Sequence, residues 1–148
     1  MRENVIQKNV DWQCLPTWRR ASTNTLWCLL GCSIGDFGTI AYFQWSALDW
    51  PVLSIMTLAI INGLISSIVL ETYILSRQMK LRLAFDTAIR MSFISMVAME
   101  LAMNLTDLLL VGDAKLVWWV VPFMLLTGFL TPLPYNYWRL KALGKSCH

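Results

Sequence analysis

Residues 50–75 read WPVLSIMTLAIINGLISSIVLETYIL, a long apolar run with one charged side chain, Glu71. A helix of about 20 apolar residues crosses the hydrocarbon core of a bilayer, so this run predicts a transmembrane helix. Three further runs qualify, at residues 24–43, 87–111 and 116–135. The short connections favour antiparallel neighbours. We therefore expect an all-α membrane protein, a four-transmembrane-helix bundle that forms a single domain over residues 1–148.

The composition agrees with a surface that faces lipid. Of the 148 residues, 57% are hydrophobic and 14% are charged, whereas soluble domains average about 25% charged. The eight tryptophans suit the membrane interface. The first 23 residues contain no apolar segment of a signal peptide, so we expect the first run to remain as a helix. The lipid bilayer is the expected partner. Nucleic acid is not, because a nucleic-acid interface needs a basic face.

The basic residues orient the chain. All of them except Lys115 precede the first run, flank the loop after the second run, or follow the fourth. The positive-inside rule therefore predicts that both termini are cytoplasmic. Pro132 and Pro134 should break the fourth helix near its inner end, because proline lacks a backbone donor.

Polar residues in the first run share one helical face. Cys28, Cys32 and Asp36 are spaced i, i+4 and i+8. Gly31 and Gly35 form a small-xxx-small pattern that lets another helix approach closely. A packing seam with two buried thiols is the structural alternative, but the aspartate argues against a face that only packs.

The third run contains a second such face. Met96, Glu100, Met103 and Asp107 are spaced i, i+4, i+7 and i+11, and Met99 lies beside them. Methionine at helical spacing usually fills a core, but the carboxylates on the same stripe favour a site.

The two faces are predicted to meet. The first and third helices run in the same direction, and Asp36 and Glu100 lie at equal depth, counted from the cytoplasmic ends of the runs. The simpler interpretation of Glu71 is an ion pair with a loop arginine. The corresponding interpretation of Asp107 is contact with water at the outer end.

This combination of side chains predicts a soft-metal site, because thiolates and thioethers select Cu(I). The expected metal ligands are Cys28, Cys32, Met96, Met99 and Met103. The expected charge-balancing or proton-coupling groups are Asp36, Glu100 and Asp107. The Met99-x-x-x-Met103 pair resembles the Met-x-x-x-Met helix of the high-affinity copper transporter family. We expect no enzymatic activity and no haem, since His148 is the only histidine. Whether Cys147 and His148 bind metal stays open.

Several longer phrases resemble a known family. They are GCSIGD at residues 31–36, MELAMNLTD at 99–107, and PYNYW at 134–138 followed by the ending GKSCH. Together they are similar to the bacterial membrane family described as domain of unknown function 4396. This resemblance implies a four-helix fold in the bacterial inner membrane and implies no established activity.

Two other functions remain open. The chain is small enough to be an accessory subunit of a respiratory or photosynthetic complex, with its glycine seam against another subunit, or to form a homo-oligomer. A thiol oxidoreductase is disfavoured, because an i, i+4 cysteine pair strains a disulfide and the outer loops contain no cysteine.

Overall fold

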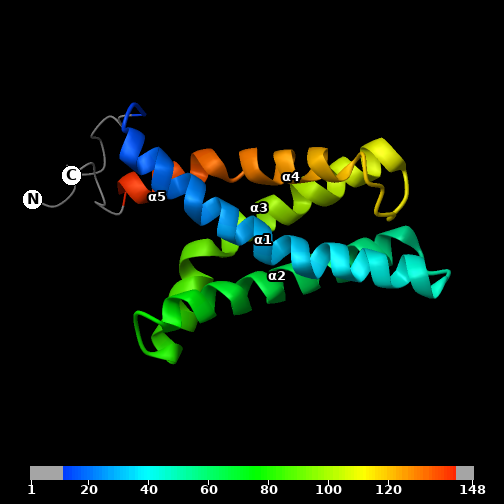
Figure 1. Ribbon diagram of the computed structural model, residues 1–148, viewed down its shortest axis with the longest axis horizontal. Coiled ribbons are helices and arrows are strands. Elements are labelled where there is room, and N and C mark those ends of the chain that lie inside the picture. Colours follow the sequence, from blue (N-terminus) through cyan, green and yellow to red (C-terminus); the bar gives the residue numbers. More distant parts are fainter. Residues whose placement is uncertain (1–11, 143–148) are drawn as a thin grey trace, which may run out of the picture.

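The computed structural model describes residues 12–142, and the regular elements of this part are all α-helices. In chain order they are α1 (Leu15–Ser46), α2 (Val52–Ser76), α3 (Leu81–Val111), α4 (Val121–Leu130) and α5 (Leu133–Ala142). The three long helices run beside one another, and α4 and α5 follow each other back along the bundle (Figure 1). The start of α1 and the end of α5 therefore lie at the same end of the molecule.

Three helices, α1, α2 and α3, are long and apolar enough to cross a membrane. The predicted all-helical fold is confirmed at this level. Both α1 and α3 begin well before the predicted runs at residues 24–43 and 87–111. For α1 the reason is local: Pro16 lies in its first turn, where a missing N–H is harmless and the fixed φ suits a helix.

The fourth predicted run, residues 116–135, is not one helix. A turn precedes Val121, and α4 contains only 10 residues, which is half of what a continuous span needs. A second turn at residues 131–132 separates α4 from α5, so the predicted break at the prolines is confirmed. The new helix begins where the Asn136 N–H donates to the Pro132 carbonyl at 2.9 Å.

The glycines of α1 are used inside the chain. A Cβ on Gly31 would lie 2.6 Å from the Cα of Ser67, and one on Gly35 would overlap the backbone of Asn62. The Ser66 hydroxyl also donates to the Gly31 carbonyl at 2.5 Å. The predicted close approach of another helix is confirmed, and this helix is α2 of the same chain, so these two glycines are not available for contact with another subunit.

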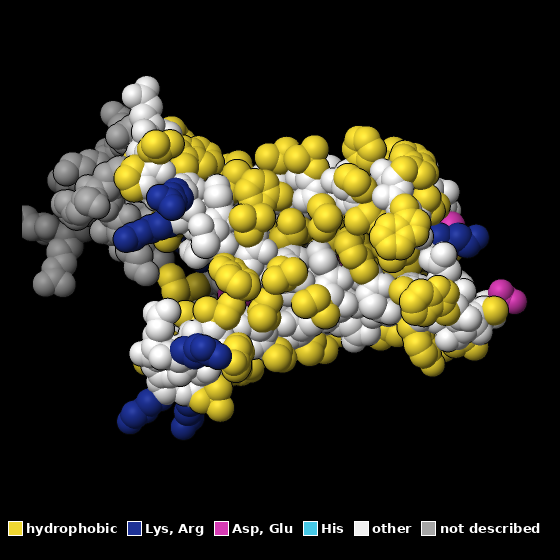
Figure 2. All heavy atoms as spheres, viewed as in Figure 1, with side chains coloured by type: hydrophobic (Ala, Val, Ile, Leu, Met, Phe, Trp, Pro, Cys, Tyr) yellow, Lys and Arg dark blue, Asp and Glu magenta, His cyan; other side chains and the backbone are white. Residues whose placement is uncertain are grey.

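The surface is largely apolar, and its charges gather at the two ends (Figure 2). Lys and Arg side chains cluster at the end where α1 starts. At the opposite end Lys115 pairs with Asp113 at 2.7 Å, and this contact lowers the pKa of the Asp113 carboxyl below its usual value. The band between the two ends is the part of the surface suited to lipid.

Candidate cation site

The sulfur-bearing side chains of α1, α3 and α4 meet in one buried cluster. Its central members are Cys28, Cys32, Met96, Met99, Met103 and Met124, packed with Leu29 and Val120. Cys28 and Cys32 are free thiols. The prediction that the polar faces of the first and third runs come together is therefore confirmed. Met124 was not predicted, because the α4 sequence offers no polar neighbour that would single it out.

Three carboxylates lie along the same interior. Asp36, Glu100 and Asp107 are each completely shielded from solvent. Both oxygens of Glu100, both oxygens of Asp107 and one oxygen of Asp36 are without a hydrogen-bond partner. The expected contact of Asp107 with water was therefore wrong, because its side chain is fully buried within the protein. An unpartnered ionised carboxylate is very costly in an apolar interior.

Among the residues that the structure describes, no basic side chain forms an ion pair with these groups. Between described residues, ion pairs join Arg90 to Asp86 and Lys115 to Asp113, and both lie near the ends of α3. Within the bundle the partner of Asp36 is a neutral amide: Asn104 donates from Nδ2 to Asp36 Oδ1 at 3.0 Å. The carboxylates are thus neutral through protonation, or they are balanced by a cation that the chain does not itself supply.

The polar faces of α1 and α3 meet with a small shift along the helices from the predicted register, in which Asp36 and Glu100 were at equal depth. Asp36 accepts a hydrogen bond from Asn104, one turn beyond Glu100, while Cys32 of α1 also lies close to Glu100. Asp36 also interacts electrostatically with both Glu100 and Asp107. The carboxylates of α1 and α3 therefore lie beside the sulfur-bearing side chains in the bundle interior.

Glycines on the neighbouring helices make room for these side chains. A Cβ on Gly63 of α2 would overlap the Glu100 carboxylate, and a Cβ on Gly128 of α4 would lie 2.6 Å from Met103 Cγ. Both glycines were missed from sequence. The Gly63-x-x-x-Ser67 spacing was a usable signal, since small residues one turn apart mark close helix contacts.

Glu71 lies where the interior opens. Its Oε1 accepts a hydrogen bond from the Cys28 thiol at 2.6 Å, and it forms no ion pair with an arginine in the described part of the chain. The expected pair with a loop arginine was therefore wrong. Glu71 and Cys28 both line a cavity of about 440 Å³ at the end where α1 begins.

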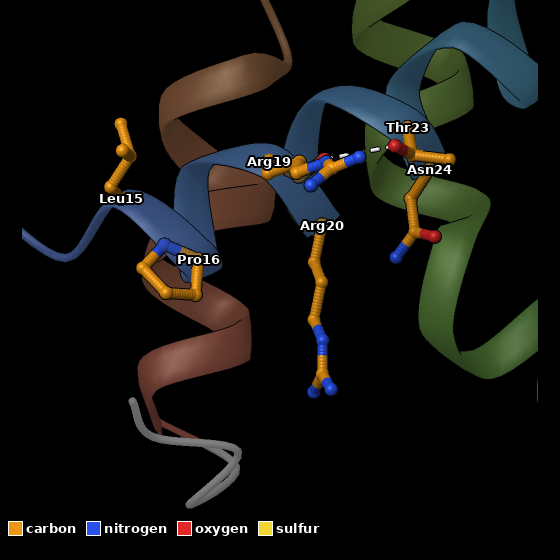
Figure 3. Close-up of a pocket in the computed structure, with 6 residues that line it drawn as sticks. All are labelled: Leu15, Pro16, Arg19, Arg20, Thr23 and Asn24. Carbon is orange, nitrogen blue, oxygen red and sulfur yellow. Dashed lines mark hydrogen bonds between the residues drawn. The ribbon is translucent and has the colours of Figure 1, made fainter. Parts of the chain in front are cut away.

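A second depression lies along the first part of α1, and none of its lining residues belongs to the sulfur cluster. Figure 3 shows its six lining side chains. Its lining comes from residues 15–24, including the exposed Arg19 and Arg20. The Thr23 hydroxyl donates to the Arg19 carbonyl at 2.9 Å, so the polar group there is satisfied within the helix. Cys147 and His148, whose metal binding the sequence left open, lie outside the described residues.

The donor set limits which ions fit. In residues 12–142 no three His, Cys, Asp or Glu side chains gather into a group that could hold a metal ion. A metal in this cluster would therefore need thioether sulfurs among its ligands. That requirement favours a soft ion over Zn²⁺ or Mg²⁺.

A comparison with protein families places the chain. The model of domain of unknown function DUF4396 matches residues 17–145. The chain belongs to the DUF4396 family. The match covers the five helices except for the first two residues of α1, so the resemblance seen in the sequence is confirmed. The sulfur and carboxylate residues lie within the DUF4396 domain. No curated protein and no solved structure shows a significant match.

Proposed function

We propose that this DUF4396 protein binds a soft monovalent cation, with Cu(I) the first candidate, and passes it through the bundle interior. One observation carries the proposal: buried, unpartnered carboxylates lie among thiol and thioether sulfurs, and no basic residue of the described part of the chain forms an ion pair with them. A cation is the ligand that satisfies both kinds of group at once.

The arrangement along the axis supports movement as well as binding. Glu71 and Cys28 lie at the open cavity. Cys32 and Glu100 follow, and Asp107 lies furthest towards the other end. Successive groups of similar affinity let an ion move in steps, because no single site holds it too tightly. Glu100 and Asp36 would exchange protons with the ion, which keeps the interior close to neutral.

The proposal includes a topology. We infer four crossings of a bacterial inner membrane, the fourth made by α4 and α5 together, with both termini cytoplasmic. The concentration of Lys and Arg at one end supports this orientation (Figure 2). The break between α4 and α5 is compatible with a crossing, because neighbouring helices re-satisfy freed backbone groups in membranes.

The test is metal content after anaerobic purification in mild detergent. We expect near-stoichiometric copper in the wild-type protein, and a loss of at least tenfold in Cys32→Ser and in Met103→Leu. Met56→Leu is the matched control, because Met56 is also buried but belongs to a different core cluster with Phe43 and Ile55. It should retain the metal.

Each outcome distinguishes metal binding by the sulfur-bearing side chains from a role in core packing alone. Stoichiometric copper in both Cys32→Ser and Met103→Leu would refute the sulfur site. Equal loss in the Met56→Leu control would show that any core change releases the ion. Absence of metal from a folded wild-type protein that is also unable to take up added Cu(I) would reduce the sulfurs to packing groups.

A further inference from the structure

The cavity at the start of α1 has features that the cation path does not use. About 440 Å³ of space lies between α1, α2, α3 and α5, within the range of small-molecule sites. Its apolar walls include Trp27, Ile74 and Leu140. Polar side chains such as Glu71 and Arg139 line the same cavity. A cavity of this mixed kind suits a molecule with both an apolar body and polar groups.

Several polar groups in this wall lack partners. Arg139 lines the cavity, and its Nε and Nη1 atoms are buried without a hydrogen bond. Ser95 and Asn136 also line it and are only 1% and 5% exposed, and Ser95 Oγ and Asn136 Oδ1 have no partner. Buried groups of this kind are normally satisfied. Their convergence on one cavity therefore points to a ligand with hydrogen-bonding groups.

The same cavity contains charges of both signs. Glu71 lies in its wall, but its carboxylate accepts a hydrogen bond from the Cys28 thiol and does not form an ion pair with Arg139. Two opposite charges that share a cavity without pairing can each hold one end of a ligand. An anion alone would leave Glu71 unbalanced, and a cation alone would leave Arg139 unbalanced.

We propose that this cavity binds a small zwitterion, a molecule that joins an ammonium to an acidic group and carries an apolar substituent. The acidic group would lie on the Arg139 guanidinium, which suits bidentate binding of carboxylate or phosphate. The ammonium would lie on Glu71. The proposal does not rest on cation transport. The same chemistry is offered by a free amino acid and by the headgroup of phosphatidylethanolamine, and the test has an arm for each.

The first arm uses three probes of one shape on the full-length protein in phosphatidylglycerol nanodiscs, because the headgroup of this lipid carries no ammonium. L-Leucine carries both charges, 4-methylpentanoate only the acid, and 3-methylbutylamine only the ammonium. We expect calorimetry to show leucine binding, with each single-charge analogue at least tenfold weaker. The second arm uses native mass spectrometry, which should show phosphatidylethanolamine retained over phosphatidylglycerol if the ligand is a lipid.

The variants assign the binding to the cavity. Arg139→Gln and Glu71→Gln should each weaken binding of the active probe by at least tenfold. Arg77→Gln should leave it unchanged, because Arg77 is held by the Tyr73 hydroxyl at 2.6 Å outside the cavity. No binding in either arm, equal binding of the single-charge analogues, or undiminished binding by Arg139→Gln would overturn the proposal. The probe comparison is made on the wild-type protein and does not depend on whether a variant folds.

Discussion

Replacing Glu100 with methionine should stabilise the metal-free protein. Glu100 is fully buried, both carboxylate oxygens lack a hydrogen-bond partner, and the surrounding side chains are largely sulfur-bearing and apolar. Methionine has nearly the same length and shape as glutamate, so it fills the space above Gly63 without leaving a cavity. The substitution therefore removes an unsatisfied polar group and adds little strain.

The magnitude follows from the state of the two oxygens. A buried polar group without a partner costs about 1–3 kcal/mol, and charged side chains at the centre of a membrane cost about 2.5–3.5 kcal/mol on insertion scales. A protonated Glu100 pays the first cost and avoids the second. We therefore expect Glu100→Met to raise the free energy of unfolding by about 1–3 kcal/mol. Glu100→Gln should raise it less, because its amide stays unpartnered.

Reversible unfolding in mixed detergent and SDS micelles, followed by circular dichroism, measures this difference. Leu101→Met is the matched control: it introduces the same side chain one residue away, where Leu101 is 55% exposed, and should change stability by less than about 0.5 kcal/mol. A Glu100→Met protein that is less stable by 1 kcal/mol or more, beside an unchanged control, would mean that the carboxylate has a stabilising partner. The reasoning from unpartnered oxygens would then fail.

Three further variants test other contacts. Gly63→Ala should lower stability by about 1–3 kcal/mol, because its methyl overlaps the Glu100 carboxylate. A Cβ on Gly38 would meet open space, so Gly38→Ala should be neutral or stabilising by up to about 1 kcal/mol. Equal changes in stability at Gly63 and Gly38, measured by SDS unfolding, would contradict the packing. Thr127→Val removes a 2.8 Å hydrogen bond between α3 and α4 and should cost about 0.6 kcal/mol; a cost above about 2 kcal/mol would indicate another role. Topology can be tested with an impermeant maleimide, counting only labelling above that of the parent protein. Gln78→Cys should react only after cells are opened, whereas Lys115→Cys should react in intact cells. The reverse pattern would show the opposite orientation.

The helix faces of α1 and α3 were predictable because helical periodicity depends only on sequence spacing. The buried positions Cys32, Met96 and Met103 follow from residues three, four and seven apart. The unsatisfied state of Glu100 was not predictable in the same way, because it depends on what the other helices bring to it. Gly63 of α2 supplies space and no donor, and only the packed bundle reveals this.

The error in register has a physical cause. The sequence interpretation counted depth from the starts of the apolar runs, whereas α1 begins at Leu15 and α3 at Leu81. Counted from these observed starts, Asp36 lies between Glu100 and Asn104, and its hydrogen bond goes to Asn104. Hydropathy marks where lipid contact is favourable and does not mark where a helix begins. A helix start judged from hydropathy therefore omits the polar first turns that lie at the membrane interface.

Glu71 shows why the cavity at the start of α1 was not predicted from the sequence. A carboxylate near a basic loop suggests a surface ion pair, and such pairs contribute little to stability. In the fold this carboxylate turns inward to the Cys28 thiol, while Arg139, which comes from α5, shares its cavity without pairing. A packing role alone would favour closing that ion pair or replacing both charges by apolar groups. Leaving the charges apart keeps the cavity polar at the point where it reaches the sulfur cluster. We infer that stability has been given up here for binding, which is the pattern expected at a functional site.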